Sequence, residues 1–300
     1  MDKVVVLMST YNGEKYLTTQ IDSILAQEGV DIKILVRDDG STDKTKEILD
    51  RYKRDGKIQW YTGENKGPAK SFMDLIFNAP DADFYAFSDQ DDYWLPKKLY
   101  FALLKLKKYS QDVPNLYYGN TTLVDADLSF INQNKTEYIF NKFNNALVSS
   151  NATGCTMCFN KKLLGVIRMY SPEYQIMHDG WLHKVCLAVG GKVIYDNKSY
   201  IYYRQHGNNV VGGQSSLIKR WRQRINTIRK SPCSRSNGIK ELYNGYGEYM
   251  SLEKKQCCKL IIEYRNSINN RMKLLFNNQI FSPNRRIDFI YRMSVLFGKF

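Results

Sequence analysis

The stretch Ile34–Asp43, ILVRDDGSTD, decides the fold of this chain. It is an apolar run that ends in two carboxylates and a polar turn. Stretches of the same kind occur at Val4–Gly13, VVVLMSTYNG, and at Phe84–Trp94, FYAFSDQDDYW. Short apolar runs are typical of strands buried on both faces of a parallel sheet, which carries its binding loops at the carboxyl ends of the strands. The sequence therefore predicts three buried strands whose polar loops converge on one edge.

Segments with helical spacing separate these strands, so the fold class that we expect is α/β. In the segment Tyr16–Gln27, for example, Leu17, Ile21 and Ile24 share one face. The order of elements predicts a mostly parallel central sheet with helices on both faces. The other expected helices are Thr45–Tyr52, Lys70–Ile76, a segment from Leu99 and His178–Val189, and the other expected strands are Ile58–Tyr61, Leu116–Val124, Thr156–Phe159, Lys192–Tyr195 and Ser199–Arg204.

The charge of the chain is unevenly distributed. The 300 residues carry a net charge of +14, which would indicate nucleic-acid or anionic-membrane binding if it were spread evenly. Up to residue 216 there are 26 basic and 25 acidic residues, and after it there are 18 basic and 5 acidic ones. We therefore expect a nearly neutral α/β domain over residues 1–213 and a basic, helical region over residues 214–300, with a boundary near Gly212-Gly213.

The cysteines and the start of the chain point to a reducing, cytosolic setting. Six cysteines are scattered along the chain, and the apolar run after Met1 is too short for a signal peptide or a membrane span. The pair Cys155-x-x-Cys158 lies in a strand-like segment and has no second pair at zinc spacing. We expect it to be part of the core.

Asp38 and Asp39 follow the second predicted strand. Ser41, Thr42 and Asp43 can all cap the next helix through side-chain oxygens, but capping does not require two carboxylates before the turn. A carboxylate at the end of a strand is well placed to accept hydrogen bonds from a ribose or a base. We expect at least one of the two aspartates to contact a ligand.

Three carboxylates, Asp89, Asp91 and Asp92, lie within four residues after the third strand. They form either a solvated acidic turn or a site for Mg²⁺ or Mn²⁺, which bind one or two carboxylates together with diphosphate oxygens. Such a metal neutralises a leaving diphosphate. Neither G-x-G-x-x-G nor G-x-x-x-x-G-K-[ST] occurs, which weakens the dehydrogenase and P-loop interpretations.

Two later polar segments are ambiguous by themselves. His178-Asp179 precedes a predicted helix, so it is either a capping aspartate beside a solvent-facing histidine or part of a catalytic site. Tyr203–Asn209 is the end of a strand followed by a polar turn.

Four motifs, in this order and spacing, resemble the family 2 glycosyltransferases, the inverting group with the GT-A, or nucleotide-diphospho-sugar transferase, fold. They are Ser9–Gly13, Asp38–Asp43, Asp89–Asp92 and His178-Asp179. The resemblance extends to about Gly213. It is strongest to a bacterial rhamnosyltransferase-like branch, through Phe87–Pro96, Thr153–Met157, Met177–Asp179 and Tyr203–His206.

The resemblance implies a role for each matching residue. Asp39 would contact the base and Asp38 would support the loop, while Asp89 would lie near the ribose. Asp91 would coordinate Mn²⁺ or Mg²⁺, and Asp179 would be the general base. Nucleotide-sugar binding is expected of Thr10, Tyr11, Asn12, Asp38, Asp39, Asp89 and Arg204, and Arg204 and His206 would close over the diphosphate, with His206 as a further metal ligand.

The resemblance also implies a function, namely inverting transfer of L-rhamnose from dTDP-L-rhamnose to a saccharide acceptor in bacterial surface or capsular polysaccharide synthesis. The basic C-terminal region favours an acceptor that is lipid-linked. One alternative is the same reaction with a different UDP- or dTDP-sugar. A more distant one is a nucleic-acid-binding protein with a basic tail, against which the neutral body and the carboxylate-rich loops argue.

The basic region suggests a location for such an enzyme. Apolar residues from Leu217 to Ile228 recur at helical spacing, with Trp221 and six cations between Lys219 and Lys230. This pattern predicts an amphipathic helix on an anionic membrane, so we expect a peripheral enzyme on the cytoplasmic face of the plasma membrane. Two later stripes, at Leu260–Leu275 and Phe289–Phe300, either pack on the body or form a homo-oligomer.

Overall fold

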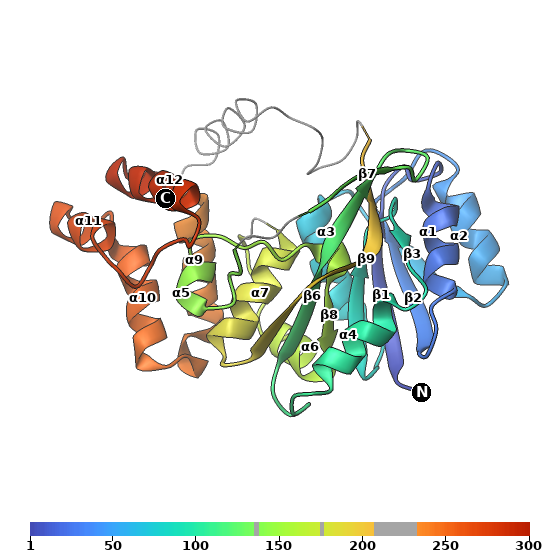
Figure 1. Cartoon of the computed structure of the whole chain (residues 1–300), viewed down its shortest axis with the longest axis horizontal. Helices are drawn as coiled ribbons and strands as arrows, with labels where there is room; N and C mark the ends of the chain where they lie inside the picture. Colours follow the sequence, from blue (N-terminus) through green and yellow to red (C-terminus); the bar gives the residue numbers. More distant parts are fainter. Residues whose placement is uncertain (135–137, 175–176, 207–232) are drawn as a thin grey trace.

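The computed structural model describes residues 1–134, 138–174, 177–206 and 233–300, and their strands form one mixed sheet. Its strand order is β3-β2-β1-β4-β8-β6-β9-β5, with β7 paired to β6 (Figure 1). The strands are β1 (Lys3–Thr10), β2 (Asp31–Asp38), β3 (Ile58–Thr62), β4 (Phe84–Ser88), β5 (Tyr93–Trp94), β6 (Asn115–Val124), β7 (Phe130–Gln133), β8 (Cys158–Asn160) and β9 (Lys192–Arg204).

The first half of the sheet is parallel, as the alternation of elements predicts. Strands β3, β2, β1 and β4 run in one direction, joined by α1 (Leu17–Leu25), α2 (Thr45–Arg54) and α3 (Pro68–Asn78). In the register, Thr10 pairs with Asp38 and Met8 pairs with Ser88. The polar loops that follow β1, β2 and β4 therefore leave the same edge of the sheet.

The second half differs from the expectation in two places. The residues Gly154–Thr156 form a 3-10 turn, η1, because the Met157 amide donates to the Gly154 carbonyl, so the predicted strand Thr156–Phe159 is reduced to β8. The two strands predicted in 192–204 are one strand, β9. It stays paired with β6 because β9 accommodates its extra residues in two register shifts, between its pairings with Tyr118 and Asn120 and between those with Asn120 and Thr122.

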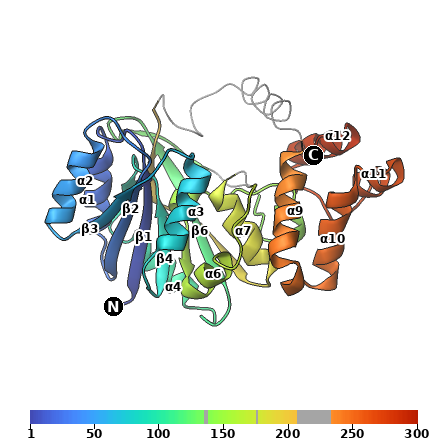
Figure 2. The same ribbon diagram turned by 180° about the vertical axis from the view of Figure 1, so that it is seen from behind.

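Helices cover both faces of the sheet (Figures 1 and 2). Alternate residues of β1 separate the two cores. Val4 and Val6 pack with α1, α2 and α4 (Lys98–Leu106), while Val5 and Leu7 pack with α3, α6 (Lys161–Ile167) and α7 (His178–Ala188).

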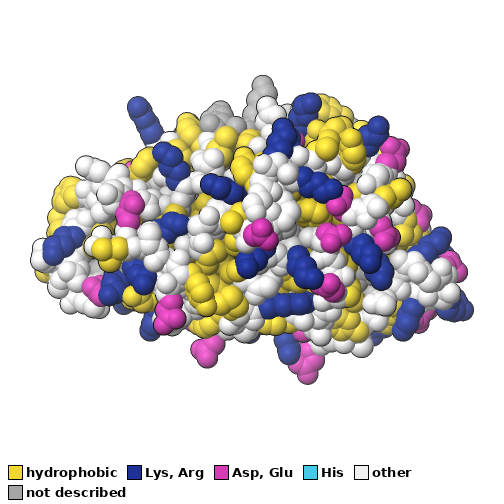
Figure 3. Space-filling view, turned by 90° about the horizontal axis from the view of Figure 1, so that it is seen from below, with side chains coloured by type: hydrophobic (Ala, Val, Ile, Leu, Met, Phe, Trp, Pro, Cys, Tyr) yellow, Lys and Arg dark blue, Asp and Glu magenta, His cyan; other side chains and the backbone are white. Residues whose placement is uncertain are grey.

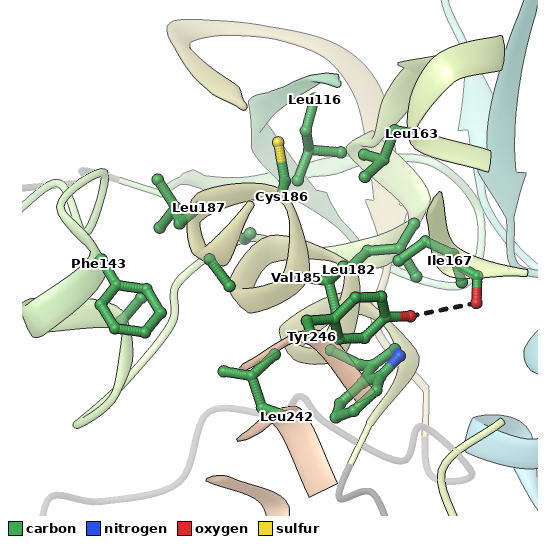
Figure 4. Packing of buried hydrophobic residues seen from close by; sticks show 14 of the residues in the cluster. Leu116, Phe143, Leu163, Ile167, Leu182, Val185, Cys186, Leu187, Leu242 and Tyr246 are labelled. Carbon is green, nitrogen blue, oxygen red and sulfur yellow. Dashed lines mark hydrogen bonds between the residues drawn. The ribbon is translucent and has the colours of Figure 1, made fainter. Parts of the chain in front are cut away.

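The C-terminal helices extend the second core. In Figure 4, α7 lies between Leu116 of β6 and the residues Leu242 and Tyr246 of α9, and the Tyr246 hydroxyl donates to the Ile167 carbonyl oxygen at 3.2 Å. These helices are α9 (Ser234–Tyr246), α10 (Leu252–Glu263), α11 (Ile268–Leu275) and α12 (Arg285–Leu296), with a 3-10 turn η2 (Gly247–Tyr249), and α5 (Phe143–Ala146) packs beside them.

Some of the expectations for the basic region, residues 214–300, can be compared with this arrangement. The expected boundary near Gly213 and the stripe Leu217–Ile228 lie outside the described residues. Of the two later stripes, Ile261, Tyr264 and Phe300 are buried. Large apolar side chains on α11, on α12 or directly after α12 are exposed, namely Ile268, Met272, Phe289, Leu296 and Phe297. Of the helices that the structure describes, none combines the length and the apolar character needed to cross a bilayer.

The face seen from below in Figure 3 carries basic and acidic side chains intermingled.

Candidate active site

The loops after β1 and β2 are tied to each other at the carboxyl edge of the sheet. The Asn12 amide donates to Ser41 Oγ at 2.9 Å, and the Thr42 amide donates to Asn12 Oδ1 at 2.9 Å. The Gly13 amide donates to Thr45 Oγ1 at 2.8 Å. Asn12 has φ of 49°, in the left-handed region that asparagine tolerates better than most residues. The two loops therefore form one rim.

Asp38 and Asp39 are both buried at this rim and have different partners. The Asp38 carboxylate accepts from the amides of Gly40, at 3.1 Å, and Ser41, at 3.0 Å, so it holds its own loop. The Asp39 carboxylate forms an ion pair with Arg37 and accepts from the Ser71 hydroxyl. A buried carboxylate needs such partners to stay charged.

Gln90 connects the loop after β1 to the acidic loop after β4. Its Oε1 accepts from Thr10 Oγ1 at 2.6 Å and from the Tyr11 amide at 2.8 Å, while its Nε2 donates to the Tyr11 carbonyl oxygen at 3.1 Å. Gly13 lies against the same side chain, because a Cβ there would come within 2.5 Å of Gln90 Oε1. The middle residue of Asp89-Gln90-Asp91 thus fixes the two loops together.

The end of β9 brings Arg204 and His206 to Asp91. His206 Nε2 lies 2.8 Å from Asp91 Oδ2, and Arg204 Nε donates to the Asp91 carbonyl oxygen at 2.8 Å. The ring of Tyr16 stacks on His206 with centroids 5.1 Å apart, and the Arg204 guanidinium carbon lies 4.4 Å from the centre of the same ring. A carboxylate, an imidazole and a guanidinium therefore meet at one point.

A second acidic cluster lies directly behind Asp91. Potential ligand atoms of Asp89, Asp92 and Cys155 lie within 4.8 Å of one another. Burial and the charges of Asp91 and Asp179 raise the pKa of Asp89 to about 7. Burial, with the neighbouring carboxylates, also raises the pKa of Asp92 and of the Cys155 thiol. Burial and mutual repulsion therefore make these three groups harder to ionise.

Asp179 lies in the first turn of α7, and its Oδ1 accepts from the Gly180 amide at 2.5 Å. The positive end of the helix stabilises a carboxylate there. Met177, not Asp179, is the N-cap residue, so the capping alternative is wrong. The solvent-facing histidine is wrong too, because His178 is buried, with its ring stacked on Phe72 at 3.9 Å between centroids.

The predicted site residues fall into two neighbouring groups. Contacts or mutual charge effects link Thr10, Tyr11, Asp89, Asp91, Asp179, Arg204 and His206. Asn12, Asp38 and Asp39 belong to the adjoining rim, which the loop after β1 joins to the first group.

Sequence reasoning missed three residues that position this site, namely Arg37, Gln90 and Tyr16. Arg37 had a signal, since a lone cation inside an apolar strand requires a buried partner. It donates to Asp74 at 2.8 Å and pairs with Asp39. Neither Gln90 nor Tyr16 had a comparable signal, because their contacts join segments distant in sequence.

Comparisons with known proteins agree with this geometry. The family model described as Glycosyl transferase family 2 matches residues 5–167. The dTDP-rhamnosyl transferase RfbG of Shigella flexneri is 30% identical over 240 residues, which are 74% of this chain and 79% of RfbG. An uncharacterized glycosyltransferase of Nostoc sp. is 30% identical over 219 residues, 69% of this chain and 66% of its own length.

A solved structure shares the fold. The crystal structure of S. aureus TarS 1-349 in complex with UDP-GlcNAc aligns with a TM-score of 0.57 at 17% identity, covering 99% of this chain and 89% of TarS 1-349. The mixed sheet with its parallel first half and the flanking helices is the GT-A arrangement. The chain is therefore a GT-A glycosyltransferase of the rhamnosyltransferase-like type and belongs to glycosyl transferase family 2.

Proposed function

We propose that this enzyme transfers L-rhamnose from dTDP-L-rhamnose to a saccharide acceptor with inversion at the anomeric carbon. The observation that carries the proposal is the convergence of Asp89, Asp91 and Asp179 at the carboxyl edge of the sheet. The choice of donor rests on the similarity to RfbG, whose name specifies a dTDP-rhamnosyl transferase. The nucleotide-sugar class is also supported by the fold shared with TarS, whose structure holds UDP-GlcNAc.

In this proposal the rim after β1 and β2 binds the nucleotide. Thr10, Tyr11, Asn12 and Asp39 would surround the base and the adjoining sugar, and Asp38 would keep the loop in shape through its bonds to Gly40 and Ser41. Asp89 would face the ribose. The Arg37 ion pair and the Ser71 hydroxyl fix the Asp39 carboxylate, so binding a donor requires little reorganisation of this residue.

Asp91 and His206 fit a divalent cation. Two neighbouring ligands of an octahedral ion with bonds of about 2.1 Å lie roughly 3 Å apart, and Asp91 Oδ2 and His206 Nε2 are separated by 2.8 Å. A carboxylate oxygen and an imidazole nitrogen suit Mn²⁺ and are compatible with Mg²⁺. When bound, the cation would neutralise charge on the leaving diphosphate. Arg204, beside Asp91, would contribute a further positive charge there.

Asp179 would act as the general base. Its carboxylate would take the proton of an acceptor hydroxyl while that oxygen forms a bond to the anomeric carbon, and the bond from that carbon to the diphosphate oxygen breaks on the opposite face. The first turn of α7 holds the carboxylate through the Gly180 amide. Holding donor and acceptor in line contributes roughly 7–11 kcal/mol relative to a free encounter.

The acceptor is proposed to be lipid-linked, with the enzyme on the cytoplasmic face of an anionic membrane. Residues 233–300 carry 12 basic and 5 acidic side chains. Phe276, Phe289 and Phe297 on or beside α11 and α12 are 69%, 58% and 65% exposed, respectively. Exposed aromatic rings among cations are suited to a membrane interface.

Liposome sedimentation tests the membrane part of the proposal. Binding should rise with anionic lipid, fall with salt, and weaken in Phe289→Ser/Phe297→Ser. The matched control Tyr109→Ser removes an exposed aromatic side chain from the body and should bind as the wild type does. Equal binding to neutral and anionic liposomes, or none at low salt, would contradict this location and leave oligomerisation as the role of the exposed residues.

Nucleotide release from a panel of nucleotide sugars tests the donor. We expect the purified enzyme to hydrolyse dTDP-L-rhamnose faster than dTDP-glucose, UDP-glucose and UDP-GlcNAc, and to require Mn²⁺ or Mg²⁺. Preference for a UDP-sugar would change the donor and keep the reaction class. No release from any donor in the presence of metal would refute the proposed reaction.

A further inference from the structure

A cavity of about 230 Å³ lies beside Asp179, between the loop after α5 and the first turns of α7 and α9. The helices α7 and α9 are neighbours in both ribbon views (Figures 1 and 2). The cavity is separate from the rim proposed for the nucleotide. Its lining residues are Leu147, Val148, Ser149, Ser150, Met177, Asp179, Gly180, Trp181, Lys184, Arg235 and Gly238.

Two cations, Lys184 and Arg235, face one acidic residue, Asp179, among the described residues that line this cavity. Lys184 Nζ donates to the Gly180 carbonyl oxygen at 3.2 Å, and the described residues give it no salt bridge. Burial lowers the pKa of Lys184 to about 8, with Asp179 opposing the shift and the charge of Arg235 adding to it. The two cations repel each other, so an anion between them would be stabilised.

The backbone adds to the positive potential. The lining residues Asp179, Gly180 and Trp181 belong to the first turn of α7, and Arg235 belongs to the first turn of α9. The N-terminal end of a helix carries roughly half a positive charge and favours anions. Asp179 already accepts from the α7 backbone, whereas α9 has no side-chain cap at its N-cap residue, Cys233.

The remaining walls suit a sugar. Leu147, Val148, Met177 and Trp181 are apolar lining residues, and Ser149 adds a hydroxyl group. Pockets for small molecules commonly combine apolar walls with a few charged groups that fix the orientation of the ligand.

We propose that this cavity binds the acceptor through an anionic substituent, a phosphate or a carboxylate, which Lys184 and Arg235 hold while an acceptor hydroxyl faces Asp179. This inference rests on the proposed function, since it assigns the acceptor class of the same reaction. The enzyme would then prefer acidic saccharides over neutral ones of equal size.

Ligand-observed NMR titrations of the full chain, loaded with dTDP and Mg²⁺, test this inference without requiring turnover. The probes are methyl glucuronide, methyl glucoside 6-phosphate and the neutral methyl glucoside. We expect at least one charged sugar to bind about tenfold more tightly than the neutral one, the effect of one favourable, partly screened charge pair. The two charged probes distinguish a carboxylate from a phosphate.

Three variants test whether Lys184 is responsible for the preference for the charged sugar. Lys184→Gln should lose most of the preference for the charged sugar, and Lys184→Arg, which keeps the cation, should retain it. Lys192→Gln is the matched control, because Lys192 is exposed on β9 and does not line the cavity. Thermal unfolding of each variant reports whether it is folded.

The outcomes separate this inference from the proposed function. Equal affinity for the three sugars, no detectable binding of the charged sugars, or a preference unchanged in folded Lys184→Gln would overturn the anionic acceptor. Failure of the enzyme to release nucleotide from any donor would refute the proposed reaction, independently of the affinities that the titration gives for the three sugars.

Discussion

We predict that replacing His178 by phenylalanine increases the stability of the protein relative to the wild type when the pH is lowered from 7 to 5. The His178 side chain is 3% exposed, its ring stacks on Phe72, and it meets Phe87 edge-on with centroids 4.9 Å apart. Neither ring nitrogen has a hydrogen-bond partner among the described residues. The site therefore suits an aromatic ring and disfavours a positive charge.

The sign and size of this change in stability follow from the pKa of His178. Burial lowers this pKa from 6.5 to about 4, and the charge of Asp179 partly opposes the shift. Between these values the unfolded chain binds the proton and the folded protein does not. The free energy of unfolding of the wild type thus falls as the pH drops from 6.5 toward 4. From pH 7 to pH 5 the loss from this residue is about 2 kcal/mol.

Urea unfolding of the wild type and of His178→Phe at pH 7 and pH 5 measures the effect. We expect the free-energy difference between the two proteins to move by about 2 kcal/mol in favour of the variant at pH 5. A packing cost of the larger ring is the same at both pH values and cancels. Phe159→Leu, a nontitrating change in the same core, should show no such movement. If the unfolding free energies of the wild type and His178→Phe differ by the same amount at pH 7 and pH 5, the reasoning is refuted.

Three further substitutions test the site. Asp91→Asn keeps the shape of the side chain but loses the charge that is proposed to hold the cation, so metal-dependent nucleotide release should disappear while thermal unfolding is unchanged. Full activity in the variant would contradict the metal assignment. Asp179→Asn should lower kcat by on the order of 10²–10⁴-fold with little change in the donor KM, whereas a change confined to KM would make Asp179 a binding residue. Gly13→Ala places a methyl group 2.5 Å from Gln90 Oε1. It should displace the Gln90 amide from Thr10 and Tyr11 and so raise the donor KM, and an unaltered KM would show that the Gln90 link is dispensable.

The parallel half of the sheet was predictable because each buried strand is a short apolar run followed by a polar loop. Once β1, β2 and β4 are parallel neighbours, Thr10, Asp39 and Asp91 must approach the same edge. Sequence spacing also indicated α7, whose first turn carries Asp179.

Other features depend on contacts that local sequence does not encode. Gln90 acts through Thr10 and Tyr11, which lie about eighty residues earlier in the chain. The strand expected over Thr156–Phe159 begins only at Cys158, because backbone hydrogen bonds close the turn η1 first. The cavity beside Asp179 requires α9, whose docking on α7 follows from three-dimensional packing.

The anomeric configuration of the first product tests the central claim most directly. Proton NMR during hydrolysis of dTDP-L-rhamnose, recorded before the free sugar mutarotates, reports which anomer the enzyme releases. A single displacement in which Asp179 activates the attacking oxygen predicts rhamnose of the opposite configuration to the donor, and loss of its formation in Asp179→Asn. Release of rhamnose with the configuration of the donor, or formation at the wild-type rate in Asp179→Asn, would contradict this account.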